Sequence, residues 1–85
     1  MKRREEWRPI LETEIKRWSA KSCAQLLSEL SIEQCYEVEF EGKKYQAEVQ
    51  LLENTDTYVH VGIDVDDGSI PASFRPLSSS FIRNK

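Results

Sequence analysis

Three aspartates near a glycine, in the stretch IDVDDGSIP (residues 63–71), come closer to metal-binding chemistry than other parts of the chain. A calcium-binding loop of the EF-hand type places its ligands at alternate positions, followed by a glycine and, at the twelfth position, a glutamate. Here Asp66 and Asp67 are adjacent, and the twelfth position counted from Asp64 is Arg75. Asp67-Gly68 between apolar alternations is instead typical of a hairpin turn. The stretch therefore predicts a turn and not a calcium site.

Thiol and imidazole groups are common zinc ligands, and the chain has two cysteines and one histidine. A structural zinc site takes four ligands, so Cys23, Cys35 and His60 are too few. The cysteines lie twelve positions apart without a CxxC motif, which favours ordinary reduced thiols over a disulfide or a catalytic pair. We therefore expect no metal and no cofactor.

Two glutamates beside a histidine can act as general acid and base, and Glu37, Glu48 and His60 are the candidates. Such a site also needs a concave pocket that excludes water, which the flat middle of a small sheet rarely supplies. The sequence contains no GxSxG, HExxH or glycine-rich phosphate motif. A small enzyme or ligand-binding domain that uses this cluster is therefore the alternative function, and no residue is assigned a catalytic role.

The elements that must position these side chains begin with a helix. Pro9 suits a first helical position, where its missing N–H costs nothing. An apolar stripe at helical spacing follows it and consists of Leu11, Ile15 and Trp18. Acids and bases can pair one turn apart on the opposite face, as Glu12–Lys16 and Glu14–Arg17. Trp7 stands among charged residues and has two interpretations. It forms an exposed helical face with Leu11 and Ile15 that mediates a dimer contact, or it packs against the sheet, which needs a cover.

A second helix is predicted because the first stripe loses phase near Ser19–Ser22. Ser22 and Gln25 match a capping box, in which each side chain satisfies the other residue's backbone amide. The new stripe has the spacing i, i+3, i+4, i+7 and consists of Cys23, Leu26, Leu27 and Leu30. We predict two helices, with a single kinked helix as the alternative.

The second half of the chain alternates apolar and polar residues, which is typical of β-strands. Gly42-Lys43 is interpreted as a two-residue turn with glycine first, as a type II′ turn requires. The resulting hairpin has three apolar pairs: Phe40 with Tyr45, Val38 with Ala47 and Tyr36 with Val49. A third strand, TYVHVGIDV (residues 57–65), is joined to the second by a loop of odd length, because an even one would reverse the faces.

A fourth strand is predicted after the Asp67-Gly68 turn. It gives the apolar pairs Val65 with Ile70, Ile63 with Ala72 and Val61 with Phe74. Pro71 then lies on an edge strand, where a missing donor is tolerated. We expect the last residues to fold back onto the core edge through Leu77, Phe81 and Ile82, with a helical turn that begins at Ser78.

These registers predict rows of polar side chains on the outer face of the sheet. One row is Cys35, Gln50, His60 and Arg75; the next is Glu37, Glu48, Gly62 and Ser73. Glu37 opposite Glu48 would be a like-charge pair, which is mildly destabilising and which a basic partner would offset. Tyr58 opposite Leu52 would expose apolar surface, as interaction sites do. We hypothesise a partner-binding surface formed by Glu37, Glu48, Tyr58, His60 and Arg75; the alternative is an ordinary solvated sheet face.

The composition, with 39% hydrophobic and 32% charged residues, is typical of a soluble globular protein. Apolar runs are at most two residues long, and no apolar stretch follows the basic start, so we expect neither a membrane span nor a secretory signal. Residues 1–21 carry seven Lys or Arg against four Glu, whereas the rest carry five against eleven Asp or Glu. Most of the chain is therefore too acidic to bind nucleic acid, which requires clustered cations.

Several stretches between residues 18 and 82 share a pattern with known sequences: Trp18-Ser19, the paired leucines of the second helix, YEVEFEGKKYQAEVQLLE, VDDGS and RPLSSSFI. In these the chain resembles a family of short hypothetical bacterial proteins. The family has no established activity, so the resemblance implies a fold and transfers no catalytic or binding residue.

Together these observations predict one α+β domain over residues 1–85, with residues 1–6 as a flexible tail. Two N-terminal helices pack on one face of a four-stranded antiparallel β-meander. The predicted core is Leu11, Ile15, Trp18, Leu26, Leu27, Leu30, Val38, Phe40, Val49, Val61, Ile63 and Phe74. We expect a cytoplasmic, non-enzymatic adaptor or regulator that binds another protein through its acidic outer sheet face. We expect no membrane or nucleic-acid partner, and the oligomeric state is left open.

Overall fold

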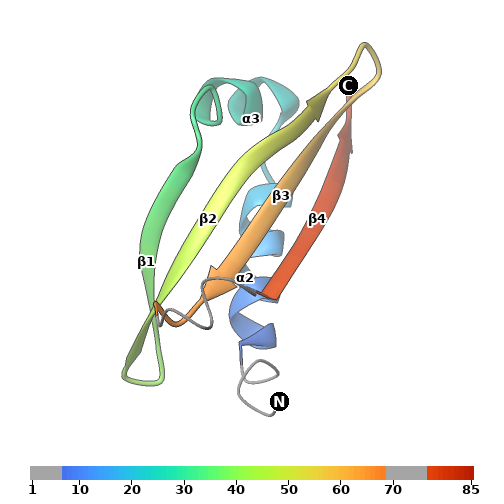
Figure 1. Ribbon diagram of the computed structural model, residues 1–85. Coiled ribbons are helices and arrows are strands. Elements are labelled where there is room, and N and C mark those ends of the chain that lie inside the picture. The colour runs from blue at the N-terminus through green and yellow to red at the C-terminus, as the bar shows by residue number, and fades with distance from the viewer. Residues whose placement is uncertain (1–6, 69–76) are drawn as a thin grey trace.

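The computed structural model describes residues 7–68 and 77–85. Within them, helices α2 (Arg8–Ser19) and α3 (Cys23–Glu29) precede strands β1 (Gln34–Phe40), β2 (Lys43–Asn54), β3 (Tyr58–Asp66) and β4 (Leu77–Asn84). The strands form one antiparallel sheet in the order β1-β2-β3-β4 (Figure 1). The predicted α+β class, with two helices before a four-stranded antiparallel sheet, is confirmed. The tail predicted for residues 1–6 lies outside the described residues.

The break between the helices has the predicted cause. The Ser22 hydroxyl accepts a hydrogen bond from the Gln25 backbone N–H at 3.2 Å, and the Ser22 N–H donates to Gln25 Oε1 at 3.1 Å. This capping box begins α3, while α2 ends at Ser19. The chain therefore forms two helices and not one kinked helix. Neither is long and apolar enough to cross a membrane.

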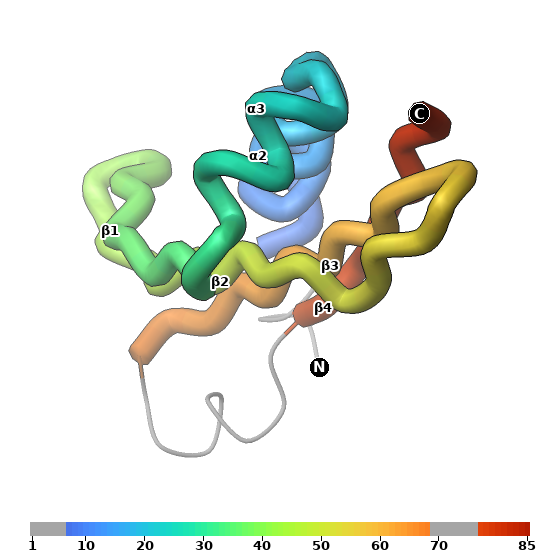
Figure 2. Tube along the Cα trace, turned by 90° about the horizontal axis from the view of Figure 1, so that it is seen from above, coloured from blue at the N-terminus to red at the C-terminus, as the bar shows by residue number. Residues whose placement is uncertain are grey.

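The helices contribute to the same buried cluster as the strands. In Figure 2 both helices lie on the same side of the four strands. The cluster contains apolar side chains from α2, α3, β2 and β3 and from residues next to the helices: Trp7, Ile10, Leu11, Trp18, Leu26, Leu30, Tyr45, Val49, Val59, Val61, Ile63 and Val65. Four further predicted core residues, Ile15, Leu27, Val38 and Phe40, are half-buried against it. The twelfth predicted core residue, Phe74, lies outside the described residues.

Of the two interpretations of Trp7, packing against the sheet is confirmed, because only 2% of the residue is exposed and its ring packs edge-on to Tyr45 of β2 with 6.3 Å between centroids. The buried stripe of α2 therefore begins one turn earlier than predicted and runs through Trp7, Leu11 and Trp18. Glu14 occupies the position between Leu11 and Trp18 on that stripe. It is accordingly buried, with 3% exposed, whereas the sequence pattern placed it on the solvated face.

The buried Glu14 carboxylate is fully engaged. The Tyr36 hydroxyl donates a hydrogen bond to it and accepts one from Trp18 Nε1 at 2.8 Å. Arg17 Nη1 lies 3.6 Å from Glu14 Oε1, so the predicted Glu14–Arg17 pair forms, with one end buried. Burial of the phenol and its hydrogen bond to Glu14 raise the pKa of Tyr36 to about 12. Hydrogen bonds and a nearby cation are what make a buried carboxylate tolerable.

The β1–β2 hairpin has the predicted faces but not the predicted register. Phe40 pairs with Lys43, Val38 with Tyr45 and Tyr36 with Ala47, two residues away from the predicted partners. The turn consists of Glu41 and Gly42, whose φ angles of 51° and 77° are both positive, as in a type I′ turn. The predicted Gly42-Lys43 type II′ turn is therefore wrong. A shift of two residues leaves every side chain on its own face.

The fourth strand is also different from the one predicted. A turn does follow β3, with the Gly68 N–H donating to Asp66 Oδ1 at 2.7 Å. However, Val65 pairs with Leu77, Ile63 with Ser79 and Val61 with Phe81, so the predicted pairs with Ile70, Ala72 and Phe74 are wrong. Those three residues lie outside the described part of the chain. The expected helical turn at Ser78 is strand β4.

Candidate functional site

The outer face of the sheet, defined by Glu37, Glu48, His60, Asp64 and Ser80, carries most of the predicted site. In the structure, the residues that stand side by side on this face differ from those predicted. Glu48 lies between Cys35 and Asp64, and Asp64 pairs in turn with Ser78. Glu37 pairs with Gln46, so the predicted Glu37–Glu48 pair is wrong. A like-charge pair is present nevertheless, because Glu48 stands opposite Asp64.

Four carboxylates, from Glu33, Glu48, Asp64 and Asp66, form what we call the acidic cluster. A hydrogen bond between protonated Glu48 and Glu33, partial burial and the charges of Glu33, Asp64 and Asp66 raise the pKa of Glu48. Glu48 therefore holds a proton more readily than an isolated glutamate, because nearby carboxylates resist ionising together. Glu33, in the turn before β1, was missed by the sequence interpretation, which considered only strand residues.

The acidic cluster borders Cys35, and donor atoms of Glu33, Cys35 and Glu48 lie within 4.8 Å of one another. Partial removal from water and the charges of Glu48 and Glu33 raise the pKa of the Cys35 thiol. A thiol held in its neutral form is a poor nucleophile and a poor ligand. Three exposed donors also fall short of the four that a structural zinc site requires. This set therefore provides no metal centre by itself.

Glu37 has a cation of its own. Lys44 Nζ lies 3.9 Å from Glu37 Oε1, and both side chains are largely exposed. An exposed pair of this kind contributes little to stability. Lys44 therefore pairs with Glu37 and not with the carboxylates of the acidic cluster.

His60 lies away from the glutamates with which it was predicted to act. It pairs with Glu53 on β2 and Ile82 on β4, and not with Gln50. Asp64, beside Glu48, is four residues further along β3, a separation of about 13 Å at the rise of a strand. The Glu37/Glu48/His60 cluster is therefore not assembled. Arg75, the fifth predicted site residue, lies outside the described residues.

His60 lies next to a hydroxyl and a carboxylate, the groups that accompany a catalytic histidine in hydrolases. His60 Nε2 lies 2.9 Å from Ser80 Oγ, and His60 Nδ1 lies 4.0 Å from Glu53 Oε1. The Tyr58 hydroxyl donates to the same Glu53 oxygen at 3.1 Å, and this bond raises the pKa of Tyr58. The order serine, histidine, glutamate is that of a hydrolytic triad.

Acyl transfer, however, also requires a pocket and donors that stabilise an oxyanion. The pockets found among the described residues are lined by other side chains. Ser80 and Glu53 are exposed, and the Glu53–His60 separation is longer than a hydrogen bond. We therefore assign the trio a structural role in joining β2, β3 and β4.

An apolar patch, formed by Leu52 and Ile82, lies beside His60. Leu52 is the extra residue of a bulge between Leu51 and Glu53, and the bulge turns its side chain to the outer face. There it packs over Gly62, where a Cβ would approach Leu52 Cδ1 to 2.9 Å. Leu52 and Ile82 remain 48% and 57% exposed. The predicted Tyr58–Leu52 pair is wrong because of the bulge, yet the exposed apolar surface is present.

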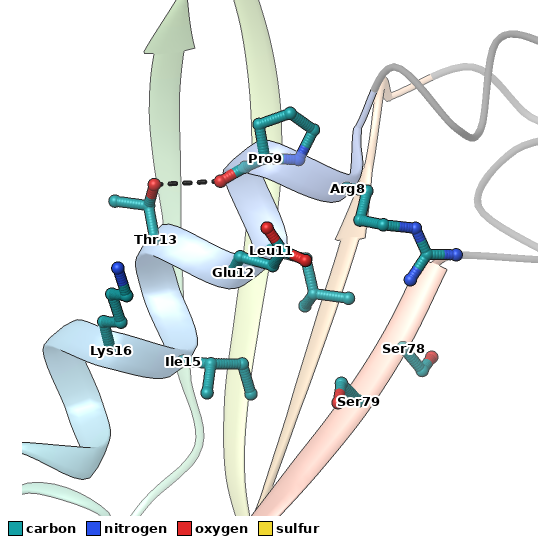
Figure 3. A pocket seen from close by; sticks show the side chains of 9 residues that line it. All are labelled: Arg8, Pro9, Leu11, Glu12, Thr13, Ile15, Lys16, Ser78 and Ser79. Carbon is teal, nitrogen blue, oxygen red and sulfur yellow. Dashed lines mark hydrogen bonds between the residues drawn. The ribbon is translucent and has the colours of Figure 1, made fainter.

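A pocket with a volume of about 540 Å³ lies elsewhere, between α2 and β4. Figure 3 shows Arg8, Leu11 and Ile15 of α2 beside Ser78 and Ser79 of β4. Pro9, Glu12, Thr13 and Lys16 complete the lining. The sequence interpretation missed this pocket because it did not place β4. The available signal was Ser79, a polar residue on the inner face between Leu77 and Phe81.

No protein-family model, curated protein or solved structure matches this chain.

Proposed function

We propose that this chain is a protein-interaction domain whose outer sheet face binds a basic surface of a partner protein. In this proposal α2 and α3 serve as the cover of the opposite face, and binding leaves them in place. The apolar cluster that joins the helices to Val49, Val61 and Ile63 supports this assignment. The outer face then remains available over β2 and β3, the two central strands.

The observation that carries the proposal is the unbalanced charge of that face. Glu48 stands opposite Asp64 and contacts Glu33, although like charges placed side by side weaken a sheet. On the described strands, the basic side chains of this face are Lys44 and His60, and each already contacts a glutamate. Lysines or arginines from a partner would relieve the repulsion and would be steered toward the face by its field.

The apolar patch gives the proposed contact a hydrophobic part. Leu52 and Ile82 lie next to half-buried Tyr58 and His60, at one end of the face. Interfaces commonly combine such a patch with a charged rim. A β-bulge on a central strand and the space left by Gly62 on the neighbouring strand are what place Leu52 there. Both features serve a surface more directly than they serve the core.

The proposal is tested by capture from a lysate of the source organism with wild type, Glu48→Lys and Glu12→Lys as baits. The two variants make the same charge change, one on the outer face and one on α2. We expect one protein to be retained by wild type and by Glu12→Lys, lost with Glu48→Lys, and released by high salt. A partner retained equally by all three baits would contradict the proposal.

The alternative, an enzyme or ligand-binding domain built on Glu37, Glu48 and His60, lacks a supporting observation. The strand registers separate His60 from the glutamates. The described pockets do not include these residues.

A further inference from the structure

Strand β4 is an edge of the sheet, with β3 as its neighbour among the described strands. Alternate residues of an edge strand direct their N–H and C=O groups away from the sheet, where another strand can pair with them. Proteins usually protect such an edge with charges, prolines or bulges. From Leu77 to Ile82 the strand has no charge and no proline, and its pairing with β3 is continuous. Among residues 7–68 and 77–85, β3 is the one strand that pairs with β4, so the other edge of β4 can accept a further strand.

The open part of the edge has a defined length. At the end of β4, the Cys23 thiol contacts the carbonyl oxygens of Arg83 and Asn84 at 3.5 and 3.2 Å. The first residues of α3 thus occupy that end and leave Leu77–Ile82. The opposite edge, β1, carries Glu37 and Glu39 on its outer side, which is the kind of protection that β4 lacks.

The pocket described above continues this edge toward α2. Ser79 faces the inner side of the sheet opposite Ile63 and is nevertheless exposed, because α2 does not cover it. Leu11 and Ile15 form an apolar part of the wall. A strand added beside β4 would direct alternate side chains into this space. The groove between α2 and β4 therefore offers both a backbone template and a side-chain pocket.

The charges of the groove indicate which side chains would enter it. Arg8 and Lys16 line the pocket, and neither has an acidic partner within 4.0 Å among the described residues. The predicted Glu12–Lys16 pair is thus not formed. Eight helical residues span about 12 Å. Side chains four residues apart on one side of a strand span about 13 Å. An extended segment with two acidic residues at that spacing matches the two cations.

We propose that the groove between α2 and β4 binds an extended segment of a partner protein, which pairs with the free edge of β4 and places acidic side chains against Arg8 and Lys16. The residue midway between the acidic ones faces Leu11 and Ile15 and is apolar, since Glu12 disfavours a third carboxylate there. This surface is distinct from the outer face, and the inference does not depend on the function proposed above. Strand addition of this kind takes affinity from the backbone and specificity from alternate side chains.

The test is a titration of the ¹⁵N-labelled chain with the peptide acetyl-Thr-Asp-Thr-Val-Thr-Asp-Thr-amide, followed by NMR. We expect shift changes confined to the amides of Leu77–Ile82 on β4 and of Arg8–Lys16 on α2. Replacing both peptide aspartates by asparagine, or introducing Arg8→Gln, should weaken binding about five- to tenfold, as expected for the loss of a charge-assisted hydrogen bond. The matched control Lys44→Gln removes a cation from the outer face and should leave the affinity unchanged.

A second peptide separates strand addition from simple charge attraction. N-methylation of alternate peptide amides removes the backbone donors while it keeps both carboxylates. Two such peptides are possible, one methylated at the odd-numbered amides and one at the even-numbered amides. Loss of binding with one of the two supports pairing with β4. Equal binding of the parent and of both N-methylated peptides would overturn the proposal, as would shift changes that avoid β4 or equal affinities for the Asp and Asn peptides. The exposed position of Arg8 means that the variant should keep the wild-type spectrum elsewhere.

Discussion

Two carboxylates, one inside the protein and one on its surface, have opposite surroundings. Glu14 is buried on the apolar stripe of α2, where Tyr36 donates to it and Arg17 lies 3.6 Å away. Glu48 is exposed on the outer face, where its neighbours are Glu33 and Asp64. The interior thus satisfies the charge that is expensive to bury, and the surface leaves a repulsion unrelieved. The first arrangement stabilises the fold, and the second suits a partner that brings positive charge.

Removal of the buried carboxylate should have the largest effect on stability. Glu14→Ala leaves the Tyr36 hydroxyl without its acceptor and opens a cavity next to Trp18. We expect the free energy of unfolding to fall by about 3 kcal/mol, as for other broken buried pairs. Urea denaturation measures it. Glu12→Ala on the exposed side of the same helix is the control, with a change within about 0.5 kcal/mol. Equal effects of the two variants would show that Glu14 has no special role.

A milder change removes only the hydroxyl that links Trp18 to Glu14. Tyr36→Phe should lower the free energy of unfolding at neutral pH by about 1 to 2 kcal/mol. The pH dependence has a definite sign. The pKa of Tyr36 is about 12 in the fold against an ordinary value of 10.0, so between these pH values the unfolded chain has lost a proton that the folded chain keeps.

Wild type should therefore lose stability relative to Tyr36→Phe as the pH rises from 10 to 12. Urea titrations of both proteins at three pH values in this range measure the difference. A gap between the two proteins that stays constant over the range would contradict the assigned hydrogen bond.

Removing a carboxylate from the surface should have the opposite effect and raise the free energy of unfolding. Glu48→Gln removes one of the repelling charges and should stabilise the protein at neutral pH, by less than about 1 kcal/mol because the site is exposed. The pKa of Glu48 is raised above 4.5 in the fold, so its ionisation costs stability as the pH rises through that region. Below it the variant and wild type should be equally stable. Glu39→Gln, opposite Lys44, is the matched control and should show no gain.

The smallest expected effect is on ester hydrolysis by Ser80, His60 and Glu53. If this trio is structural, Ser80→Ala should leave the hydrolysis of p-nitrophenyl acetate by the protein unchanged. A His60→Gln variant distinguishes general imidazole reactivity from a serine nucleophile. A burst of p-nitrophenol that Ser80→Ala abolishes would show that the trio acts as a triad and would overturn the structural assignment.

The sequence was sufficient to predict which face of the hairpin each side chain occupies but not which residues pair across the strands. Alternation has a period of two, so it specifies which side Val38 and Val49 occupy and cannot tell registers that differ by two residues. The turn decides between them, and the choice of Glu41-Gly42 over Gly42-Lys43 moved the β1 partner of Glu48 from Glu37 to Cys35. The register between β2 and β3 also differs by two residues from the predicted one, so the β3 partner of Glu48 is Asp64 and not Gly62. A surface defined by neighbouring strands is therefore less predictable than the core beneath it.

Two further errors have equally local causes. Strand β4 contains three consecutive serines, which hide its alternation, whereas Ile70, Ala72 and Phe74 present a clear period of two. Glu14 interrupts the apolar stripe of α2, so the stripe looked shorter than it is. Its partner Tyr36 lies 22 residues away in the sequence, and only the packed structure brings the two together.

The proposed function requires that the carboxylates of the outer face contact a partner. Carbodiimide labelling, with the modified residues located by mass spectrometry, measures this directly on the free chain and on the captured complex. We predict that Glu48 and Asp64 lose reactivity in the complex, while Glu12 and Glu29 on the helices keep theirs. Unchanged labelling of Glu48 and Asp64, with protection at Glu12, would contradict the account and would move the contact to α2.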